Sequence, residues 1–102
     1  MKPLRFLPEF RPLIESGRKT KTFRRTMHGE AGDVFEPWPG VKVRLVHDPA
    51  KTKAWAVAEF HHRDEGFDSP AEFMRCLKRI HPRQRDLDQM VGYLHSFELV
   101  KP

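Results

Sequence analysis

The 102-residue chain lacks the cysteine and histidine patterns that build disulfide scaffolds and metal centres. Its single cysteine, Cys76, excludes a disulfide within the chain. It has no Cys-x-x-Cys pair and no His-Glu-x-x-His motif. The adjacent His61 and His62 would point to opposite faces of a strand. We therefore expect neither a metal site nor a cofactor.

Long apolar runs are also missing. No run approaches the roughly 20 residues that cross a bilayer, and residues 1–6 lack the apolar stretch of a signal peptide. Together with the lone free thiol, these absences predict a cytoplasmic protein that does not enter the membrane. A composition of 38% hydrophobic and 32% charged residues, without repeats, predicts one globular domain over residues 1–102.

Positive charge is concentrated in the first third of the chain. Residues 1–30 hold eight Lys and Arg against three Asp and Glu, whereas residues 31–102 hold eleven of each. The segment 17–25 reads Gly-Arg-Lys-Thr-Lys-Thr-Phe-Arg-Arg and contains five cations. Such a segment faces water or an anionic ligand, because excess charge raises the local concentration of anions. A solvated loop and a nucleic-acid contact are both compatible with it.

Apolar spacing in the first half predicts short elements. Residues 4–7 are predicted to form a strand, and Phe10, Leu13 and Ile14 a short helix that ends at Gly17. Residues 21–24 have the composition of a strand. Phe23 is expected to face inward, Gly32-Asp33 to form a turn before Val34-Phe35, and Pro37-Trp38-Pro39-Gly40 to form another.

The second half shows stronger signals. Residues 41–45 alternate strictly and predict a strand, 47–51 a loop, and 53–61 a longer strand with its alanines on one face and Trp55 and Val57 on the other. Ser69-Pro70-Ala71-Glu72 predicts a capped helix start. The helix would turn Phe73, Leu77 and Ile80 inward and end at Pro82, and the alternation of Tyr93, His95, Phe97 and Leu99 predicts a closing strand.

These elements predict an α+β fold. Five or six short strands with two or three short helices favour a small, mostly antiparallel β-barrel. We expect the segments 41–45, 53–61 and 93–100 to pair within one curved sheet.

The order of the elements, taken with the basic segment, resembles the ASCH domain, a branch of the PUA-like β-barrels. The resemblance covers residues 4 to about 80 and implies an RNA-related role, with the basic motif lining a cleft. The residues that carry it are Phe10, Leu13 and Ile14 before Gly17-Arg18-Lys19-Thr20, then Thr22, Arg24, Gly32-Asp33, Glu65-Gly66-Phe67 and Ser69.

The same resemblance implies a candidate catalytic set. The family includes a small bacterial amidohydrolase that removes the acetyl group from N(4)-acetylcytidine, and its Lys, Thr and Glu correspond to Lys19, Thr22 and Glu65. In that role a neutral Lys19 amine would serve as general base and Thr22 as nucleophile, while Glu65 would orient the lysine or pass a proton. Alternatively, Lys19 and Glu65 form an ion pair that lines a binding cleft.

Further residues are candidates for ligand binding. Arg18, Lys21 and Arg24 supply positive charge, and the planar forks of Arg24 and Arg25 suit phosphate. Trp38, between two prolines, is a candidate for the cleft rim and could stack on a base, whereas Trp55 is expected in the core. A second basic cluster, which extends a nucleic-acid surface or forms a solvated helix face, consists of Arg75, Lys78, Arg79, Arg83 and Arg85.

The sequence therefore predicts a domain that binds RNA or a modified nucleoside in a basic cleft. An amidohydrolase acting on N(4)-acetylcytidine-like nucleosides is the first alternative. A protein-interaction module that uses the second basic cluster is the other.

Overall fold

The fold is organised around one long C-terminal strand. A computed structural model describes residues 3–101, in which five antiparallel strands form one sheet, accompanied by three α-helices and two 3-10 turns. The predicted α+β class is confirmed. The elements are η1 (Pro8–Phe10), α1 (Arg11–Glu15), β1 (Lys21–Arg24), β2 (Val34–Trp38), β3 (Val41–Leu45), β4 (Ala50–Lys53), α2 (Ala54–His61), α3 (Pro70–Ile80), η2 (Leu87–Gln89) and β5 (Val91–Val100).

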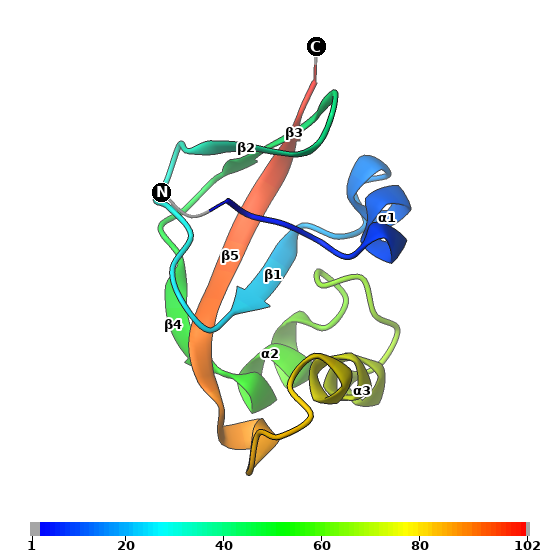
Figure 1. The fold of residues 1–102 in the computed structure, drawn as a ribbon, viewed down its shortest axis with the longest axis vertical. Coiled ribbons are helices and arrows are strands. Elements are labelled where there is room, and N and C mark those ends of the chain that lie inside the picture. The colour runs from blue at the N-terminus through cyan, green and yellow to red at the C-terminus, as the bar shows by residue number, and fades with distance from the viewer. Residues whose placement is uncertain (1–2, 102) are drawn as a thin grey trace.

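Strand β5 contacts three other strands. Its first half pairs with β1 on one edge and with β4 on the other, and its second half pairs with β3. The Val46 amide donates to the Ser96 carbonyl at 3.0 Å, so β3 and β4 follow each other along the same edge. Strand β2 extends the sheet beyond β3. Figure 1 shows β5 along the long axis, with α2 and α3 side by side near one end and the β2–β3 hairpin at the opposite end.

The apolar side chains gather in two clusters, one towards each end of β5. Each fully buried aliphatic or aromatic side chain contributes roughly 1.5–3 kcal/mol to folding. The helical cluster contains Phe23, Val57, Phe73, Leu77, Met90 and Leu94, and the hairpin cluster contains Leu4, Ile14, Phe35, Val43, Leu45 and Phe97. None of the helices in residues 3–101 is long and apolar enough to span a bilayer.

The strand predicted over residues 4–7 is wrong. This segment pairs with no strand in the described structure. Prolines at positions 3 and 8 flank it, and proline cannot donate a ladder hydrogen bond. It instead runs across the sheet without pairing with a strand (Figure 1). Leu4 is buried there in the hairpin cluster, and the Arg5 carbonyl accepts a hydrogen bond from Arg24.

The strand predicted over residues 53–61 is also wrong, because residues 54–61 form helix α2. Its alternating alanines imitate a period of two, but alanine has the strongest helix propensity of all residues. The buried positions Ala54, Val57 and Ala58 follow helical spacing instead. Trp55 is 46% exposed, not a core residue. The expected loop at 47–51 contributes its last two residues to β4.

The predicted start of α3 is confirmed. The Ser69 hydroxyl accepts a hydrogen bond from the Glu72 amide at 3.2 Å, and Pro70 occupies the first turn. The Glu72 carboxylate accepts from the Asp68 amide in return, one residue before the cap. The helix ends at Ile80, two residues before Pro82, as expected. The strands predicted at 21–24, 41–45 and 93–100 are likewise present.

Gly92 on β5 is expected to tolerate no side chain. A Cβ at this position would lie 2.6 Å from the Arg24 carbonyl oxygen and 2.7 Å from the Phe23 ring. Gly92→Ala should therefore lower the free energy of unfolding by about 1–3 kcal/mol, as other overpacking substitutions do. Urea denaturation measures this, with Ser96→Ala on the same strand as a control expected within about 0.5 kcal/mol of the parent. Equal or higher stability of Gly92→Ala would contradict the close approach.

Candidate functional site

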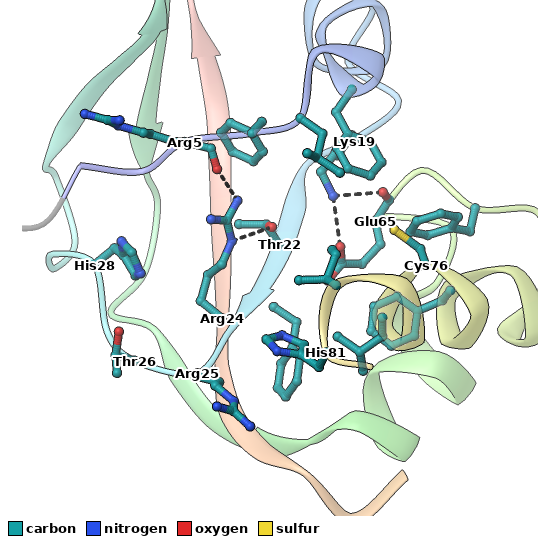
Figure 2. Close-up of a pocket in the computed structure, with 18 residues that line it drawn as sticks. Arg5, Lys19, Thr22, Arg24, Arg25, Thr26, His28, Glu65, Cys76 and His81 are labelled. Atoms are coloured by element: carbon teal, nitrogen blue, oxygen red, sulfur yellow. Dashed lines mark hydrogen bonds and ion pairs between the residues drawn. The ribbon is translucent and has the colours of Figure 1, made fainter. Parts of the chain in front are cut away.

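A cavity of about 460 Å³ lies between the N-terminal segment, β1 and α3 (Figure 2). Pockets of this size hold small organic ligands. Its walls come from four parts of the chain that are distant in sequence: residues 5–10, 19–28, 65–67 and 73–81. Lys19, Thr22, Arg24, Arg25 and Glu65, all proposed from the sequence, line it together.

A tight turn after α2 positions Glu65. The Phe67 amide donates to the His62 carbonyl and the Gly66 amide to the Arg63 carbonyl, the two bonds of a Schellman helix ending. Gly66 has a φ of +97°, and a Cβ there would lie 3.0 Å from the Leu13 side chain. Glycine therefore allows both the left-handed turn and the close packing against α1.

The basic motif is held against this same turn. The Asp64 carbonyl accepts hydrogen bonds from the amides of Thr20 and Lys21, at 2.7 and 3.0 Å. The Lys19 amide donates to the Leu13 carbonyl at the end of α1. These backbone contacts place the Lys19 and Glu65 side chains together, although the two residues are 46 positions apart.

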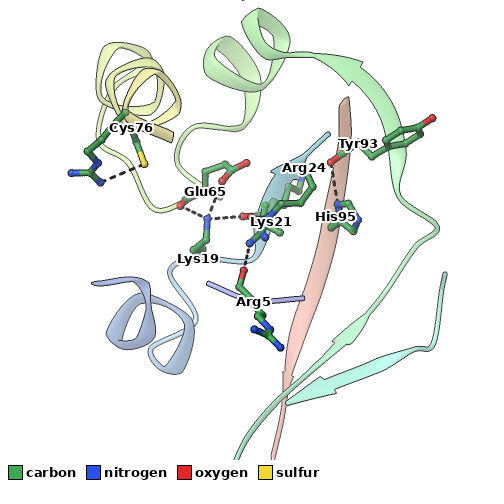
Figure 3. A network of polar contacts seen from close by, with 10 residues as sticks. Arg5, Lys19, Lys21, Arg24, Glu65, Cys76, Tyr93 and His95 are labelled. Carbon is green, nitrogen blue, oxygen red and sulfur yellow. Dashed lines mark hydrogen bonds and ion pairs between the residues drawn. The ribbon is translucent and has the colours of Figure 1, made fainter. Parts of the chain in front are cut away.

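The Lys19 ammonium group is almost completely enclosed. It is 2% exposed and donates to Glu65 Oε1 at 2.9 Å, to the Glu65 carbonyl at 2.9 Å and to the Lys21 carbonyl at 3.1 Å (Figure 3). The Phe10 ring centroid lies 4.6 Å from Nζ, a cation–π contact. Three acceptors match the three protons of a charged ammonium. The arrangement favours a cationic donor over the neutral amine that a general base requires.

The Glu65 carboxylate has one oxygen left for a ligand. The residue is 3% exposed, and Oε1 accepts from Lys19. Oε2 is buried and has no hydrogen-bond partner within the described structure. A buried oxygen of this kind carries a desolvation cost until a donor reaches it. Because Glu65 lines the cavity, an N–H or O–H of a bound molecule is the donor that would satisfy it.

Thr22 and Arg24 follow each other on the same face of β1. Arg24 Nε donates to Thr22 Oγ1 at 3.2 Å, and its Nη2 donates to the Arg5 carbonyl. The guanidinium lies 5.1 Å from the Phe6 ring centroid. Burial lowers the pKa of Arg24, and the nearby Glu65 carboxylate opposes this. Within residues 3–101 neither Lys19 nor Glu65 hydrogen-bonds to the Thr22 hydroxyl, so the contacts of a nucleophile–base pair are not formed.

Three of the predicted ligand-binding residues lie outside the cavity wall. Arg18 pairs with Asp68 on the surface, and Lys21 contacts Asp64 at 3.4 Å and His61 at 3.1 Å. The Lys21 side chain lies instead against the end of α2 and the turn that follows it, where His61 and Asp64 are its partners. Trp38 stacks on Phe6, with ring centroids 6.1 Å apart, and is not part of the cavity wall.

Aromatic rings line the cavity, and they were not among the site residues predicted from the sequence. Phe67 packs edge-on against Phe10 and Phe73, with centroids 6.0 and 5.9 Å apart. The spacing of Phe10 and Phe73 in their helices marked them as buried, but nothing local indicated a shared wall. The apolar lining comprises Phe6, Leu7, Phe10, Phe23, Phe67, Phe73, Leu77 and Ile80.

Two further polar residues on the wall come from α3 and its end. Burial raises the pKa of the Cys76 thiol, so the thiol is not activated as a nucleophile. Burial, and then the charge of Arg25, lower the pKa of His81, so its ring is neutral at pH 7. In the part of the chain that the structure describes, no group of three or more His, Cys, Asp or Glu could hold a metal ion.

The second basic cluster has mixed surroundings. Arg79 pairs with Glu9 at 2.7 Å, and Lys78 donates to the Pro82 carbonyl. Arg75, Arg83 and Arg85 are exposed. Its role in binding stays a prediction.

Comparisons with known proteins assign no family. No protein-family model matches the chain, and no curated protein or solved structure does so either.

Loss of either partner of the Lys19–Glu65 pair should destabilise the fold strongly. Lys19→Met or Glu65→Gln leaves one buried charge without its counter-charge, at a cost of about 3–5 kcal/mol. The double variant should lose at least about 1 kcal/mol less than the sum of the single losses, because the two residues interact directly. Chemical denaturation measures all four proteins.

The exposed pair Arg44–Glu98, whose closest atoms are 3.3 Å apart, is the matched control. Its Arg44→Met and Glu98→Gln variants should each cost no more than about 1 kcal/mol. Additive losses at Lys19 and Glu65 would contradict direct coupling.

His95 on β5 supports the loop behind the cavity. It is 0% exposed, its Nδ1 donates to the Tyr93 carbonyl at 3.0 Å, and its Nε2 accepts from the His28 amide at 3.0 Å. Both contacts require the neutral ring with its proton on Nδ1. Burial accordingly lowers the pKa of His95 to about 4.

Stability should fall on acidification because of His95. Between pH 6.5 and 4 the unfolded chain binds a proton that the folded chain excludes, so stability is full above about pH 6.5 and declines towards pH 4. A shift of this size corresponds to about 3 kcal/mol. Thermal melting across this range should show a smaller decline for His95→Gln than for the parent. His47→Gln, at an exposed histidine, should leave the profile unchanged, and identical profiles for all three proteins would refute the assignment.

Proposed function

We propose that the chain is an ASCH-type, PUA-like domain whose cavity binds the base of a modified nucleoside or of single-stranded RNA. The observation that carries this proposal is the buried Glu65 Oε2, which lacks a partner in the described structure and belongs to a residue that lines an aromatic-lined cavity. Such an oxygen selects a ligand that presents an N–H group.

The chemistry of the walls suits the edge of a nucleobase. Base edges present N–H donors beside carbonyl or ring-nitrogen acceptors. Glu65 Oε2 supplies the acceptor, and Arg24 has N–H groups beyond the two that Thr22 and Arg5 occupy. The rings of Phe6, Phe10 and Phe67 offer apolar surface to a flat ligand, as aromatic side chains do when they bind unpaired bases.

The motif residues support the family part of the proposal. Gly17 follows α1 with a φ of +81°, and the motif then leads directly into β1. Glu65 and Gly66 form the turn that precedes α3. Lys19, Thr22 and Glu65, which the resemblance groups together, line one cavity.

Binding is favoured over hydrolysis by the hydrogen bonds of Lys19. All three of its protons go to acceptors other than Thr22, so the lysine is not arranged to take the threonine proton. The shared cavity nevertheless makes hydrolysis of an acylated cytidine the second candidate. Both functions predict nucleoside binding, and they differ in turnover.

Nucleoside binding should depend on the Glu65 carboxylate. Calorimetry with cytidine, uridine, N(4)-acetylcytidine and a short single-stranded RNA should reveal at least one ligand. Glu65→Gln should weaken its binding by roughly tenfold or more, since a hydrogen bond to a charged group contributes about 1.5–3 kcal/mol. The measurement is made below the melting temperature of the variant, and Glu59→Gln, an exposed carboxylate on α2, is the control. Absence of binding by every ligand, or equal affinity of Glu65→Gln, would refute the site.

Thr22→Val separates binding from catalysis, because valine keeps the shape of threonine without its hydroxyl. A binding domain should keep its affinity for N(4)-acetylcytidine within about threefold, the loss of one neutral hydrogen bond, and should release no cytidine in either form. An amidohydrolase should convert N(4)-acetylcytidine to cytidine, with turnover lost in Thr22→Val. Chromatography of the reaction mixture follows the product, and turnover by the parent protein would overturn the preference for binding.

A further inference from the structure

The charge of the cavity wall goes beyond what a neutral base requires. Four cationic residues, Arg5, Lys19, Arg24 and Arg25, line the cavity, whereas Glu65 is its only acidic residue within residues 3–101. Lys19 and Glu65 neutralise each other through their 2.9 Å contact. The remaining excess is positive, and such a cavity concentrates anions.

The charged side chains of the cavity wall differ in how deeply they are buried. Lys19 and Glu65 are buried, Arg24 is half-buried, and Arg25 is exposed. Neither Arg24 nor Arg25 forms an ion pair with a carboxylate in the described part of the chain. The inner end thus offers hydrogen bonds to a neutral group, and the outer end offers uncompensated positive charge.

The Arg25 guanidinium is positioned to contact an anionic ligand. Its Nη2 donates to the side-chain carbonyl of Gln84, a neutral partner that orients the guanidinium without neutralising it. His81 lies beside it on the cavity wall (Figure 2), and the charge of Arg25 helps to lower the His81 pKa. A guanidinium fork with free donors on a cavity wall is suited to a phosphate group.

We infer that the cavity takes a phosphate-bearing nucleotide unit, with the base at Glu65 and the phosphate at Arg25. This inference rests on the proposed function, because it assumes that the base occupies the inner end. The phosphate has two sources, a free mononucleotide or the backbone of an RNA strand. Both share the chemistry that Arg25 recognises.

The test compares four ligands that carry the same base. Cytidine, cytidine 5′-monophosphate, cytidine 3′-monophosphate and the trinucleotide CpCpC are titrated by calorimetry at low and moderate salt. At least one phosphate-bearing ligand should bind roughly tenfold more tightly than cytidine at low salt. Raising the salt should reduce this advantage. A preference for a monophosphate identifies a free nucleotide, and a preference for CpCpC identifies an RNA strand.

Arg25→Gln should remove the tighter binding of the phosphate-bearing ligand and leave the affinity for cytidine within about twofold. The slope of log affinity against log salt for that ligand should become smaller by about one. The side chain is exposed, so the substitution does not disturb the core. Arg75→Gln changes the net charge equally, away from the cavity wall, and should have no such effect.

The outcomes separate the two proposals. Equal affinity for cytidine and every phosphate-bearing ligand overturns the phosphate inference and leaves base binding intact. An equal effect of Arg25→Gln and Arg75→Gln also overturns it, because the attraction would then come from overall charge. Failure of all four ligands to bind overturns this inference together with binding of an unmodified cytosine base at Glu65.

Discussion

The buried contact between Lys19 and Glu65 is the interaction on which the rest of the site depends. Removing two charges from water is costly, and their attraction repays that cost only when the geometry is good and the other hydrogen-bonding groups are satisfied. The structure meets this condition for Lys19 by joining it to the turn after α2, the start of β1 and the ring of Phe10. One lysine therefore connects elements that are far apart in sequence. Glu65 Oε2 is the part of the pair that remains unsatisfied.

Local sequence signals predicted those elements that have a capping residue, a terminal glycine or a strict alternation of apolar residues. The Ser69 cap, the glycine after α1 and the strict alternation of β3 are each decided within a few residues, and the structure contains all three. The error over residues 53–61 has a different origin. Tryptophan and valine favour a strand whereas the three alanines favour a helix, and contacts with β4, η2 and α3 decide in favour of the helix. Residues 4–7 were misjudged because an extended segment can cross a sheet without joining it.

Part of the candidate site could be predicted from the sequence through the family resemblance. The resemblance grouped Lys19, Thr22 and Glu65, and the structure places all three on one cavity wall. The hydrogen-bond partners of Lys19 could not be predicted in the same way, because two of them are backbone carbonyls, those of Lys21 and Glu65, whose directions depend on the fold. Trp38 was assigned to the rim because it stands between two prolines, but it stacks on Phe6, which lines the cavity, and does not line the cavity itself. Roles that depend on residue type were accessible from the sequence, whereas those that depend on the packing of one segment over another were not.

The same ion pair also limits what the cavity can do. Loss of a proton from Lys19 would leave the Glu65 carboxylate buried without the counter-charge that offsets its desolvation. The three hydrogen bonds of Lys19 hold the two side chains in place, so they present a fixed pattern of donors and acceptors. Fixed patterns suit recognition, because a ligand with the wrong donor leaves a buried oxygen unpaired. Proton transfer in a hydrolytic reaction would therefore need a group other than Lys19, whose hydrogen bonds already go to Glu65 and to the Lys21 carbonyl.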